Sequence, residues 1–340
     1  MTTHTARTIA ITAHIDSSWV ERLQRLSPDL RIITHGIRNG EPVPDQLWHD
    51  AEVLYTFPNH LPRPEQAPQL RWVQLYSAGA DTVLDHPLFH TSVQFTTASG
   101  VHALTIAEYV LTVTLAWFHR LPVLFQWQQQ RLWPEDRERK LAPEVIQGKT
   151  VGIVGYGSIG RHVAKLARGC GMRVLAMQRG HDHRDKGFSF PGEGDPDGTL
   201  PERYYAPEDL HAMLKESDIV VIALPLTAKT QGIINEAAFN AMKPGAFLVN
   251  IARGGVTDEA ALLKALKEQR IAGAALDVFH QEPLPADNPL WELPNVILSP
   301  HVTGFTFQYN DRAAMIFEEN LRRYLADKPL FNLVDKEQGY

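Results

Sequence analysis

Three polar residues stand just beyond short apolar runs in the second half of the chain, namely Arg253, Glu282 and His301. These runs read as strands, and because the carboxyl ends of parallel strands meet at one edge of a sheet, we expect the three side chains to lie close together. A guanidinium binds a carboxylate through two parallel hydrogen bonds. An imidazole exchanges protons near neutral pH, and a neighbouring carboxylate favours the protonated ring and sets its tautomer. The set is therefore suited to binding an anion and transferring a proton.

A glycine-rich turn in the middle of the chain is suited to holding a phosphate. The apolar run 151–154 leads directly into it, and a helical pattern follows at 161–167. In such a strand-to-helix turn the first glycine allows the tight bend, the second lets the backbone approach a pyrophosphate, and the third allows the helix to pack closely on the strand. A turn without a ligand is the weaker interpretation, because five further strand-and-helix signals surround it. The turn residues are Gly155, Tyr156, Gly157, Ser158, Ile159 and Gly160.

The residues after the next predicted strand bear on the type of dinucleotide. A carboxylate at this position binds the ribose 2′-hydroxyl of NAD, whereas an arginine suits the 2′-phosphate of NADP. Gln178 and Arg179 stand here. The pattern predicts NADP as the preferred cofactor, with NAD as the alternative. A solvated loop is the other interpretation, because Asp182 and Asp185 lie among the basic residues after Arg179 and reduce their net positive charge. These basic residues are His181, His183, Arg184 and Lys186.

The elements that position these residues follow from the apolar pattern. Short apolar runs alternate with helical stretches, which predicts parallel sheets. In the first hundred residues the predicted strands are 8–12, 31–34, 53–56, 71–75 and 93–96. A second series from about 149 to 301 predicts a doubly wound sheet, with strands at 151–154, 172–177, 219–224, 246–250, 273–276 and 296–298.

Three segments depart from this alternation. Residues 104–127 are apolar on more than one face, which predicts one long helix buried between domains or subunits. Residues 181–203 are rich in Gly, Pro, Asp and Arg and have no periodicity, so we expect a loop insertion there. Residues 311–325 form an amphipathic stretch, which we expect to pack on the first domain as a helix.

Composition and charge disfavour several classes of protein. The chain has 33 Lys plus Arg against 39 Asp plus Glu, a net charge of −6, and no basic stripe, so a nucleic-acid partner is not expected. No apolar run approaches the roughly 18 residues of a membrane span, and the N-terminal residues carry no export signal. The single cysteine, Cys170, cannot form an internal disulfide or a cysteine zinc site. We therefore predict a cytoplasmic protein without a metal site or membrane contact.

The order and spacing of several motifs resemble the D-isomer-specific 2-hydroxyacid dehydrogenase family, of the glyoxylate and hydroxypyruvate reductase type. The resemblance implies two doubly wound parallel-sheet α/β domains, with a Rossmann cofactor domain inserted into a flavodoxin-like substrate domain. The cofactor domain would be 104–304, and the substrate domain 1–103 plus 305–340. A homodimer joined through the cofactor domains is also implied. The similar segments are the glycine turn, 242–255, 277–283, 299–301 and, in the first domain, 78–81.

The resemblance also implies roles for individual residues in a hydride transfer between NAD(P)H and a 2-keto acid that yields a D-2-hydroxy acid. Arg253 would bind the substrate, and His301 would supply the proton with Glu282 beside it. Asp277 resembles the residue near the nicotinamide carboxamide. Further cofactor positions are Leu224, Pro225 and Ala252, and the backbone amides of Ser77, Ala78 and Gly79 resemble a second contact with the substrate carboxylate.

The sequence leaves the substrate open, and other activities and one other functional class share parts of this pattern. The substrate candidates are glyoxylate, hydroxypyruvate and bulkier 2-keto acids. Formate and phosphite dehydrogenases share the scaffold, and the formate enzymes carry glutamine where Glu282 stands, which argues against formate oxidation. A methyltransferase would share the glycine turn without explaining Arg253, Glu282 and His301 together. The second functional class is a non-catalytic dinucleotide sensor that binds partner proteins, as the family's corepressors do.

Overall fold

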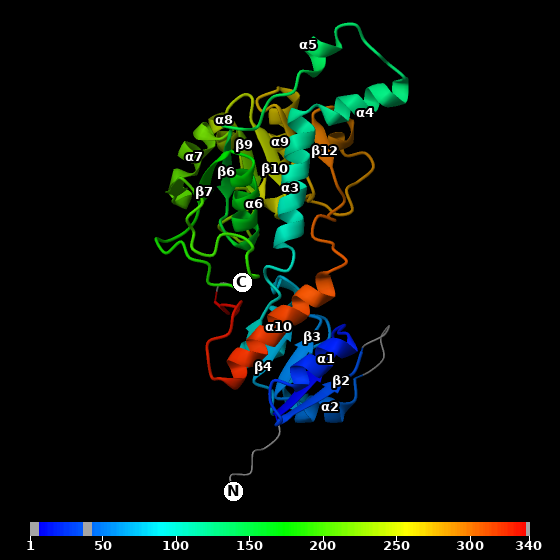
Figure 1. Ribbon diagram of the computed structural model, residues 1–340, viewed down its shortest axis with the longest axis vertical. Helices are drawn as coiled ribbons and strands as arrows, with labels where there is room; N and C mark the ends of the chain where they lie inside the picture. Colours follow the sequence, from blue (N-terminus) through cyan, green and yellow to red (C-terminus); the bar gives the residue numbers. More distant parts are fainter. Residues whose placement is uncertain (1–6, 37–42, 338–340) are drawn as a thin grey trace. The chain divides into compact units, whose positions relative to one another are not determined.

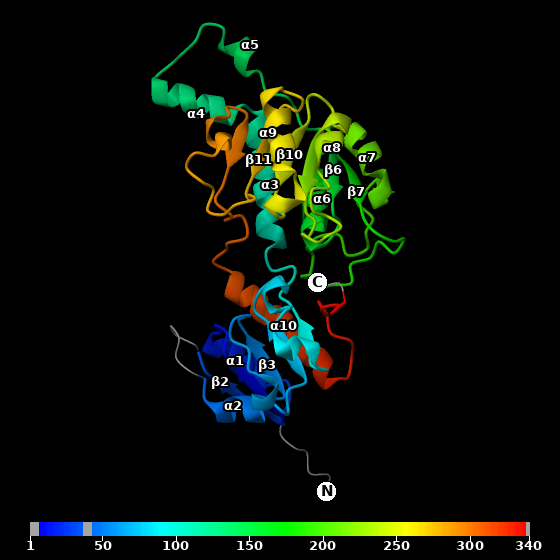
Figure 2. The same ribbon diagram turned by 180° about the vertical axis from the view of Figure 1, so that it is seen from behind.

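A computed structural model describes residues 7–36 and 43–337 of the chain. It divides into two compact units (Figures 1 and 2). Unit 1 comprises Met1–His102, Lys186–Phe188 and Thr306–Tyr340, and unit 2 comprises Ala103–Asp185 and Ser189–Phe305. The predicted substrate domain was 1–103 with 305–340. The three residues Lys186–Phe188, which the prediction left inside the insertion, group with unit 1.

Unit 1 is built on a parallel five-stranded sheet with the order β2-β1-β3-β4-β5, which is the flavodoxin-like order. All five predicted strands are present. Helix α10 packs on this sheet through Phe317 and Leu321, so the expectation for the C-terminal stretch is confirmed. The strands are β1 (Arg7–Ile11), β2 (Leu30–Thr34), β3 (Val53–Thr56), β4 (Trp72–Leu75) and β5 (Gln94–Thr96), and the helices are α1 (Ser17–Gln24), α2 (Asp45–Asp50) and α10 (Tyr309–Leu325).

Unit 2 is built on a parallel seven-stranded sheet with the order β12-β11-β10-β9-β6-β7-β8. Counted from β6, this is the Rossmann order 3-2-1-4-5-6 with one further strand at the edge. The strands are β6 (Thr150–Val154), β7 (Arg173–Met177), β8 (Arg203–Tyr205), β9 (Ile219–Ile222), β10 (Phe247–Asn250), β11 (Gly273–Leu276) and β12 (Val296–Leu298). The two sheets confirm the predicted fold class of two doubly wound α/β domains.

Helices cover both faces of the unit 2 sheet. Successive strand residues point to opposite faces, so Ile219 and Val221 of β9 pack with α3 and α6, while Val220 and Ile222 pack with α7, α8 and α9. Strands buried on both faces are apolar along their length, which explains why these runs were visible in the sequence. The helices are α3 (Ala103–Phe118), α4 (Leu121–Gln130), α5 (Arg137–Leu141), α6 (Ser158–Gly169), α7 (Leu210–Glu216), α8 (Glu236–Ala241) and α9 (Glu259–Lys267).

The prediction of one long helix over 104–127 is wrong. The chain forms α3 and α4 instead, with a break at Arg120, whose φ of 58° is left-handed. Pro122 stands at the start of α4, and a proline inside a continuous helix would clash with the carbonyl four residues earlier. Helices α4 and α5 extend away from the sheet of unit 2 in both views (Figures 1 and 2).

The insertion 181–203 is ordered, and its end forms a strand that the apolar pattern did not reveal. Strand β8 has only three residues and pairs with the edge of β7. The loop before β8 forms hydrogen bonds with the glycine turn and with α6. The Tyr156 hydroxyl donates to Asp195 over 2.6 Å, and the buried Arg161 donates to the Asp195 and His183 carbonyls over 2.6 and 2.8 Å.

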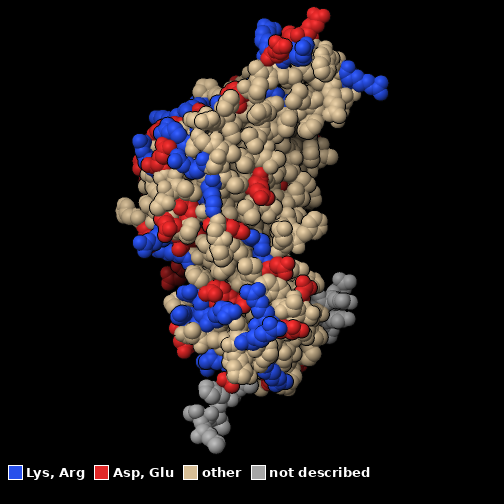
Figure 3. Space-filling model, in the orientation of Figure 1, with Lys and Arg blue, Asp and Glu red and all other residues tan. Residues whose placement is uncertain are grey.

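Short 3₁₀ helices complete the described elements: Pro64–Gln66, Asp81–Val83, Pro87–His90, Pro207–Asp209, Gly254–Val256 and Pro289–Glu292. Over residues 7–36 and 43–337, every helix is too short or too polar to span a bilayer. Basic and acidic side chains are interspersed on the face drawn in Figure 3.

Candidate active site

Glu282 and His301 meet although 19 residues separate them in the sequence. Glu282 follows β11 and His301 follows β12, two neighbouring parallel strands whose carboxyl ends share one edge of the sheet. A hydrogen bond of 2.7 Å joins Glu282 Oε2 to His301 Nδ1. Both side chains remain partly exposed, at 36% and 48%. Because Nδ1 is engaged with the carboxylate, Nε2 is the ring nitrogen turned away from Glu282.

The surroundings of Glu282 keep this carboxyl group ionised. Burial alone would raise its pKa, but the hydrogen bonds from His301 and from the Phe279 backbone N–H, together with the charges of His301 and Arg253, outweigh burial. The net effect is a pKa of Glu282 below its usual value. A charged carboxylate at this position stabilises positive charge on the adjacent imidazole.

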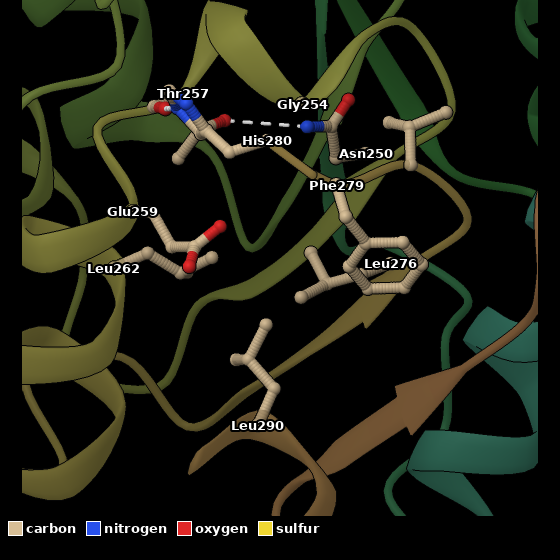
Figure 4. A pocket seen from close by; sticks show the side chains of 10 residues that line it. Asn250, Gly254, Thr257, Glu259, Leu262, Leu276, Phe279, His280 and Leu290 are labelled. Atoms are coloured by element: carbon tan, nitrogen blue, oxygen red, sulfur yellow. Dashed lines mark hydrogen bonds between the residues drawn. The ribbon is translucent and has the colours of Figure 1, made fainter. Parts of the chain in front are cut away.

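Arg253 follows β10 at the same edge of the sheet, and its side chain is exposed. Asn250, the last residue of β10, shapes the turn that carries it. The Asn250 side chain accepts from Ala252 N over 3.1 Å and donates to the Arg253 carbonyl over 3.4 Å. It also donates to Thr257 Oγ1 over 3.3 Å (Figure 4). Arg253 thus follows a strand that pairs with β11 at the same edge of the sheet, and its charge is one of the causes that lower the pKa of Glu282.

At Gly254 the backbone of the loop after β10 packs closely against the backbone of the loop after β11. A Cβ atom at this position would overlap the carbonyl carbon of Phe279, so only glycine permits this approach. A cavity of about 10 Å³ lies beneath the two loops, lined by Asn250, Thr257, Phe279 and His280 among others (Figure 4). That volume suits about one water molecule, so the cavity is too small for a substrate.

The glycine turn fits a dinucleotide pyrophosphate, as the space around each glycine indicates. Gly155 has a φ of 107°, and a Cβ there would lie 2.6 Å from the Ala223 carbonyl oxygen. A Cβ at Gly160 would lie 2.5 Å from the Gly155 carbonyl oxygen. Among the described residues, in contrast, no atom lies within 4 Å of a Cβ at Gly157. The first and third glycines serve the fold, whereas the second leaves open space at the N-terminus of α6, where phosphates bind.

The other predicted cofactor residues lie in unit 2 at or near the same edge. Tyr156 is buried with its hydroxyl on Asp195, and the Ser158 carbonyl oxygen lies 2.7 Å from His162 Nδ1. Gln178 Oε1 lies 3.2 Å from His183 Nδ1, and Arg179 is exposed. Of the four remaining residues, Ile159 belongs to the glycine turn, Leu224 and Pro225 follow β9, and Ala252 follows β10.

Asp277 is almost fully buried, at 1% exposure, and its carboxylate contacts the loop that carries His301. Oδ1 accepts hydrogen bonds from Ser299 Oγ and Val302 N, over 2.6 and 3.0 Å. Oδ2 accepts from the Thr303 backbone N–H and hydroxyl, over 3.2 and 2.6 Å. The sequence pattern did not reveal these contacts, nor the 2.8 Å hydrogen bond between Tyr109 and Ser299 that extends them into α3.

The predicted substrate loop lies in unit 1, after β4. Ser77, Ala78 and Gly79 are partly buried, and Ser77 Oγ donates to the Gly79 carbonyl over 2.7 Å. Aromatic rings surround the start of this loop. Tyr76 packs on Phe57 and Tyr309, with ring centroids 4.6 and 4.8 Å apart, and the Tyr309 hydroxyl donates to the Tyr76 carbonyl.

Comparison with known proteins agrees with this arrangement. The profile of the D-isomer specific 2-hydroxyacid dehydrogenase NAD-binding domain matches residues 111–303, which lie in unit 2 except for Lys186–Phe188. A glyoxylate reductase of Korarchaeum cryptofilum is 35% identical over 316 residues, covering 91% of this chain and 87% of the relative. The chain belongs to the D-isomer specific 2-hydroxyacid dehydrogenase family.

Other members of the family are similar over most of the chain. A (S)-sulfolactate dehydrogenase of Chromohalobacter salexigens is 34% identical over 264 residues, covering 76% of this chain and 78% of the relative. A D-isomer specific 2-hydroxyacid dehydrogenase of Xanthobacter autotrophicus Py2, solved with NADPH and MES, has a TM-score of 0.77 and 27% identity, with 98% of this chain and all of that one covered. This protein is therefore an NAD(P)-dependent 2-hydroxyacid dehydrogenase.

Proposed function

We propose that this dehydrogenase reduces a 2-keto acid to the D-2-hydroxy acid with Arg253 as the substrate-binding cation and the Glu282–His301 pair as the proton donor. The observation that carries the proposal is the 2.7 Å hydrogen bond between Glu282 and His301 at the carboxyl edge of a parallel sheet, where Arg253 follows the neighbouring strand β10. Ligands of open α/β sheets bind at this edge. Nothing in the comparisons favours the non-catalytic dinucleotide sensor.

The proposed roles follow from the charge changes of the reaction. The Arg253 guanidinium binds the substrate carboxylate and draws electron density toward the carbonyl oxygen. A reduced nicotinamide cofactor, which the glycine turn 155–160 would hold, would supply the hydride for the carbonyl carbon. His301 gives the proton on Nε2 to the oxygen as negative charge develops there. Glu282 holds the ring by Nδ1 and stabilises its charged form until the proton leaves.

Initial rates of cofactor oxidation over a panel of 2-keto acids test the proposal. The name of the Korarchaeum relative supports glyoxylate as the first substrate, and hydroxypyruvate and bulkier analogues complete the panel. Saturable oxidation of the cofactor with at least one member is the expected result. Cofactor binding with no turnover on any 2-keto acid would favour the sensor instead.

Replacement of Glu282 by glutamine is expected to move the pH dependence of reduction toward acid. The pKa of Glu282 is lowered, so the native group remains a carboxylate at all pH values above its depressed pKa and supports the protonated ring. A neutral amide at this position gives no such support. The pH at which kcat falls to half its maximum should therefore be lower in Glu282→Gln than in the native enzyme.

Profiles of kcat against pH, recorded at saturating substrate, measure this shift. The matched control is Glu292→Gln, which removes an exposed carboxylate from the 3₁₀ helix Pro289–Glu292 of the same loop region. The control should follow the native profile. A Glu282→Gln profile that coincides with the native one would show that the carboxylate does not support the proton donor.

Replacement of Gly157 by alanine is expected to weaken cofactor binding roughly tenfold or more without destabilising the protein, since overpacking a bound group costs about 1–3 kcal/mol. A methyl group at Gly157 meets no described atom, and the φ of −88° is open to alanine, so the fold tolerates it. It would occupy the space proposed for the pyrophosphate.

Fluorescence titration with NADPH and thermal unfolding without it separate the two effects. Gly245→Ala is the control, because a Cβ at Gly245 likewise meets no described atom but lies at the opposite edge of the sheet, before β10. Both variants should unfold at the native temperature. Equal cofactor affinity in the two variants would count against a pyrophosphate at Gly157.

We also propose NADP as the preferred cofactor, with Arg179 as the selecting residue. The exposed Arg179 follows β7, where no carboxylate stands to repel a 2′-phosphate. The NADPH bound in the Xanthobacter relative supports the same choice.

Replacement of Arg179 by alanine should reduce the preference for NADPH over NADH by about one to two decades, since a charge-assisted hydrogen bond contributes roughly 1.5–3 kcal/mol. The measurement is kcat/KM for both reduced cofactors. Arg173→Ala, at the start of the same strand and therefore at the other edge, is the control and should keep the native ratio. An unchanged ratio in Arg179→Ala would assign selection to another residue.

A cytoplasmic homodimer joined through unit 2 is the assembly we propose. Apolar side chains are exposed on the segment that extends from the sheet, including Phe125 at 60% and Trp133 at 83%. Contiguous exposed apolar patches mark protein interaction sites. Light scattering should give twice the chain mass for the native protein. The double variant Phe125→Ser with Trp133→Ser should give a lower mass. A monomeric native protein would exclude the assembly.

A further inference from the structure

The insertion 181–203 binds a side chain of the glycine turn itself. Tyr156 stands between Gly155 and Gly157 and is only 3% exposed. Its hydroxyl donates to Asp195 Oδ2 over 2.6 Å. Burial and the neighbouring Asp195 carboxylate raise the pKa of Tyr156 well above its usual value, so the hydroxyl keeps its proton and acts as a donor. The turn is thus bonded to the insertion through a buried, permanently protonated hydroxyl.

Asp195 is itself buried, at 5% exposure, and the insertion folds around its carboxylate. Oδ2 also accepts from Leu200 N over 3.0 Å, and Oδ1 accepts from Thr199 N over 3.0 Å. Burial would raise the pKa of Asp195, but the hydrogen bonds from Tyr156 and the two backbone N–H groups, with the charge of Arg161, outweigh it and lower the pKa. The ionised carboxylate is therefore a strong acceptor for the Tyr156 hydroxyl.

Helix α6, which follows the glycine turn, binds the same part of the insertion. Arg161 is buried in the first turn of α6 and donates to the carbonyl oxygens of Asp195 and His183 over 2.6 and 2.8 Å. The next residue, His162, has Nε2 at 3.1 Å from Glu193 Oε2. The insertion is therefore packed against the turn and also against the helix whose N-terminus is suited to binding phosphates.

The glycines on either side of Tyr156 make the turn costly to order. Glycine loses more conformational freedom on ordering than any other residue, and order that a ligand must impose on its site is subtracted from its affinity. A turn that is already held in the binding conformation avoids part of this loss.

We infer that Asp195 is a positioning residue of the cofactor site: through Tyr156 it holds the glycine turn in its binding conformation before the dinucleotide arrives. The inference gives the insertion 181–203 a role in cofactor affinity. It rests on the proposal that this turn holds the cofactor pyrophosphate.

The variant Tyr156→Phe tests the inference, because it removes the hydroxyl and keeps the ring. The Kd for NADPH and the Kd for NADH should both rise about three- to tenfold, the scale of one hydrogen bond. Their ratio should stay native, because the pyrophosphate is common to both cofactors. Isothermal titration calorimetry measures both constants. Native affinity for both cofactors would overturn the inference.

Hydrogen exchange of the backbone amides of residues 155–160 reports the order of the turn directly. Without cofactor, these amides should exchange faster in Tyr156→Phe than in the native protein. With saturating NADPH the two proteins should exchange alike, because the ligand then imposes the order. Equal exchange without cofactor would show that the hydroxyl does not order the turn, and would also overturn the inference.

Tyr204→Phe is the matched control. The Tyr204 hydroxyl donates to the Gly198 carbonyl over 2.8 Å, so this contact involves the insertion but not the glycine turn. Each variant removes one tyrosine hydroxyl and its hydrogen bond, so thermal unfolding should show similar losses of stability. Only Tyr156→Phe should bind the cofactors more weakly. Equal weakening in both variants would assign the effect to general loosening of the insertion and would overturn the role of Asp195.

A double-mutant cycle tests whether Asp195 acts through Tyr156. Asp195→Asn, which changes the volume little, should raise the Kd for NADPH at least as much as Tyr156→Phe does. In the Tyr156→Phe background its effect should be smaller, because the contact is already lost. The same factor in both backgrounds would contradict the inference.

The variant Gly157→Ala distinguishes failure of this inference from failure of the proposed cofactor site. Native NADPH affinity in Gly157→Ala would show that the turn does not hold the pyrophosphate, and the proposed site would fail. Weakened binding in Gly157→Ala together with native binding in Tyr156→Phe would leave the site in place and overturn only the role of Asp195.

Discussion

Replacement of His301 by alanine is expected to lower kcat for keto-acid reduction by about 10² to 10⁴, the usual contribution of a general acid. The variant cannot deliver the proton from Nε2 to the developing alkoxide, so water must serve in its place. Glu282 would then lack its imidazole partner but would keep its hydrogen bond from Phe279 N. The cofactor contacts proposed for the glycine turn are separate from this side chain, so the Kd for NADPH should change little.

Steady-state kinetics and NADPH titration of the same preparation test both parts. His211→Ala is the matched control, because His211 is exposed on α7, which follows β8, and β8 is the edge strand opposite to β12 in the sheet. Its kcat should equal that of the native enzyme. Native turnover in His301→Ala would remove His301 from the mechanism.

Replacement of Arg253 by alanine is expected to lower kcat/KM by about 10² to 10³, the scale seen when one stabilising donor of a developing oxyanion is removed. Both constants should change. KM should rise because the substrate carboxylate loses its cation, and kcat should fall because the carbonyl oxygen loses a positive neighbour in the transition state.

Arg253→Lys separates charge from geometry. Lysine keeps the charge but cannot form two parallel hydrogen bonds, so its kcat/KM should lie between those of the native enzyme and Arg253→Ala. Saturation curves with a single 2-keto acid measure both constants for each variant. A variant that lost kcat alone, with a native KM, would contradict a role in substrate binding.

Local pattern was sufficient to predict most of the fold. Most strands of both units are buried, so their apolar runs stand out against polar connections, as Ile219–Ile222 shows. Parallel pairing follows from alternation with helices, and the glycine turn follows from its place between a strand and a helix. Strand β8 was missed because it has only three residues at a sheet edge, of which Tyr205 alone is buried, and so short a run has no local signature. The break between α3 and α4 had a visible signal in Pro122, which outweighed the apolar pattern around it.

For the site, the sequence determined which side chains stand beyond which strands: Arg253, Glu282 and His301, each after a parallel strand of one sheet. Whether they meet was decided by tertiary structure, because the loops that carry them have no repeating pattern. His301 contacts Glu282 over 2.7 Å from a left-handed backbone conformation, and residues 299–303 around it donate four hydrogen bonds to Asp277. Likewise, only the approach of two loops requires glycine at 254. Residue type and strand order are local properties of a sequence, whereas hydrogen bonds between loops distant in the chain exist only once the sheet has aligned its strand ends.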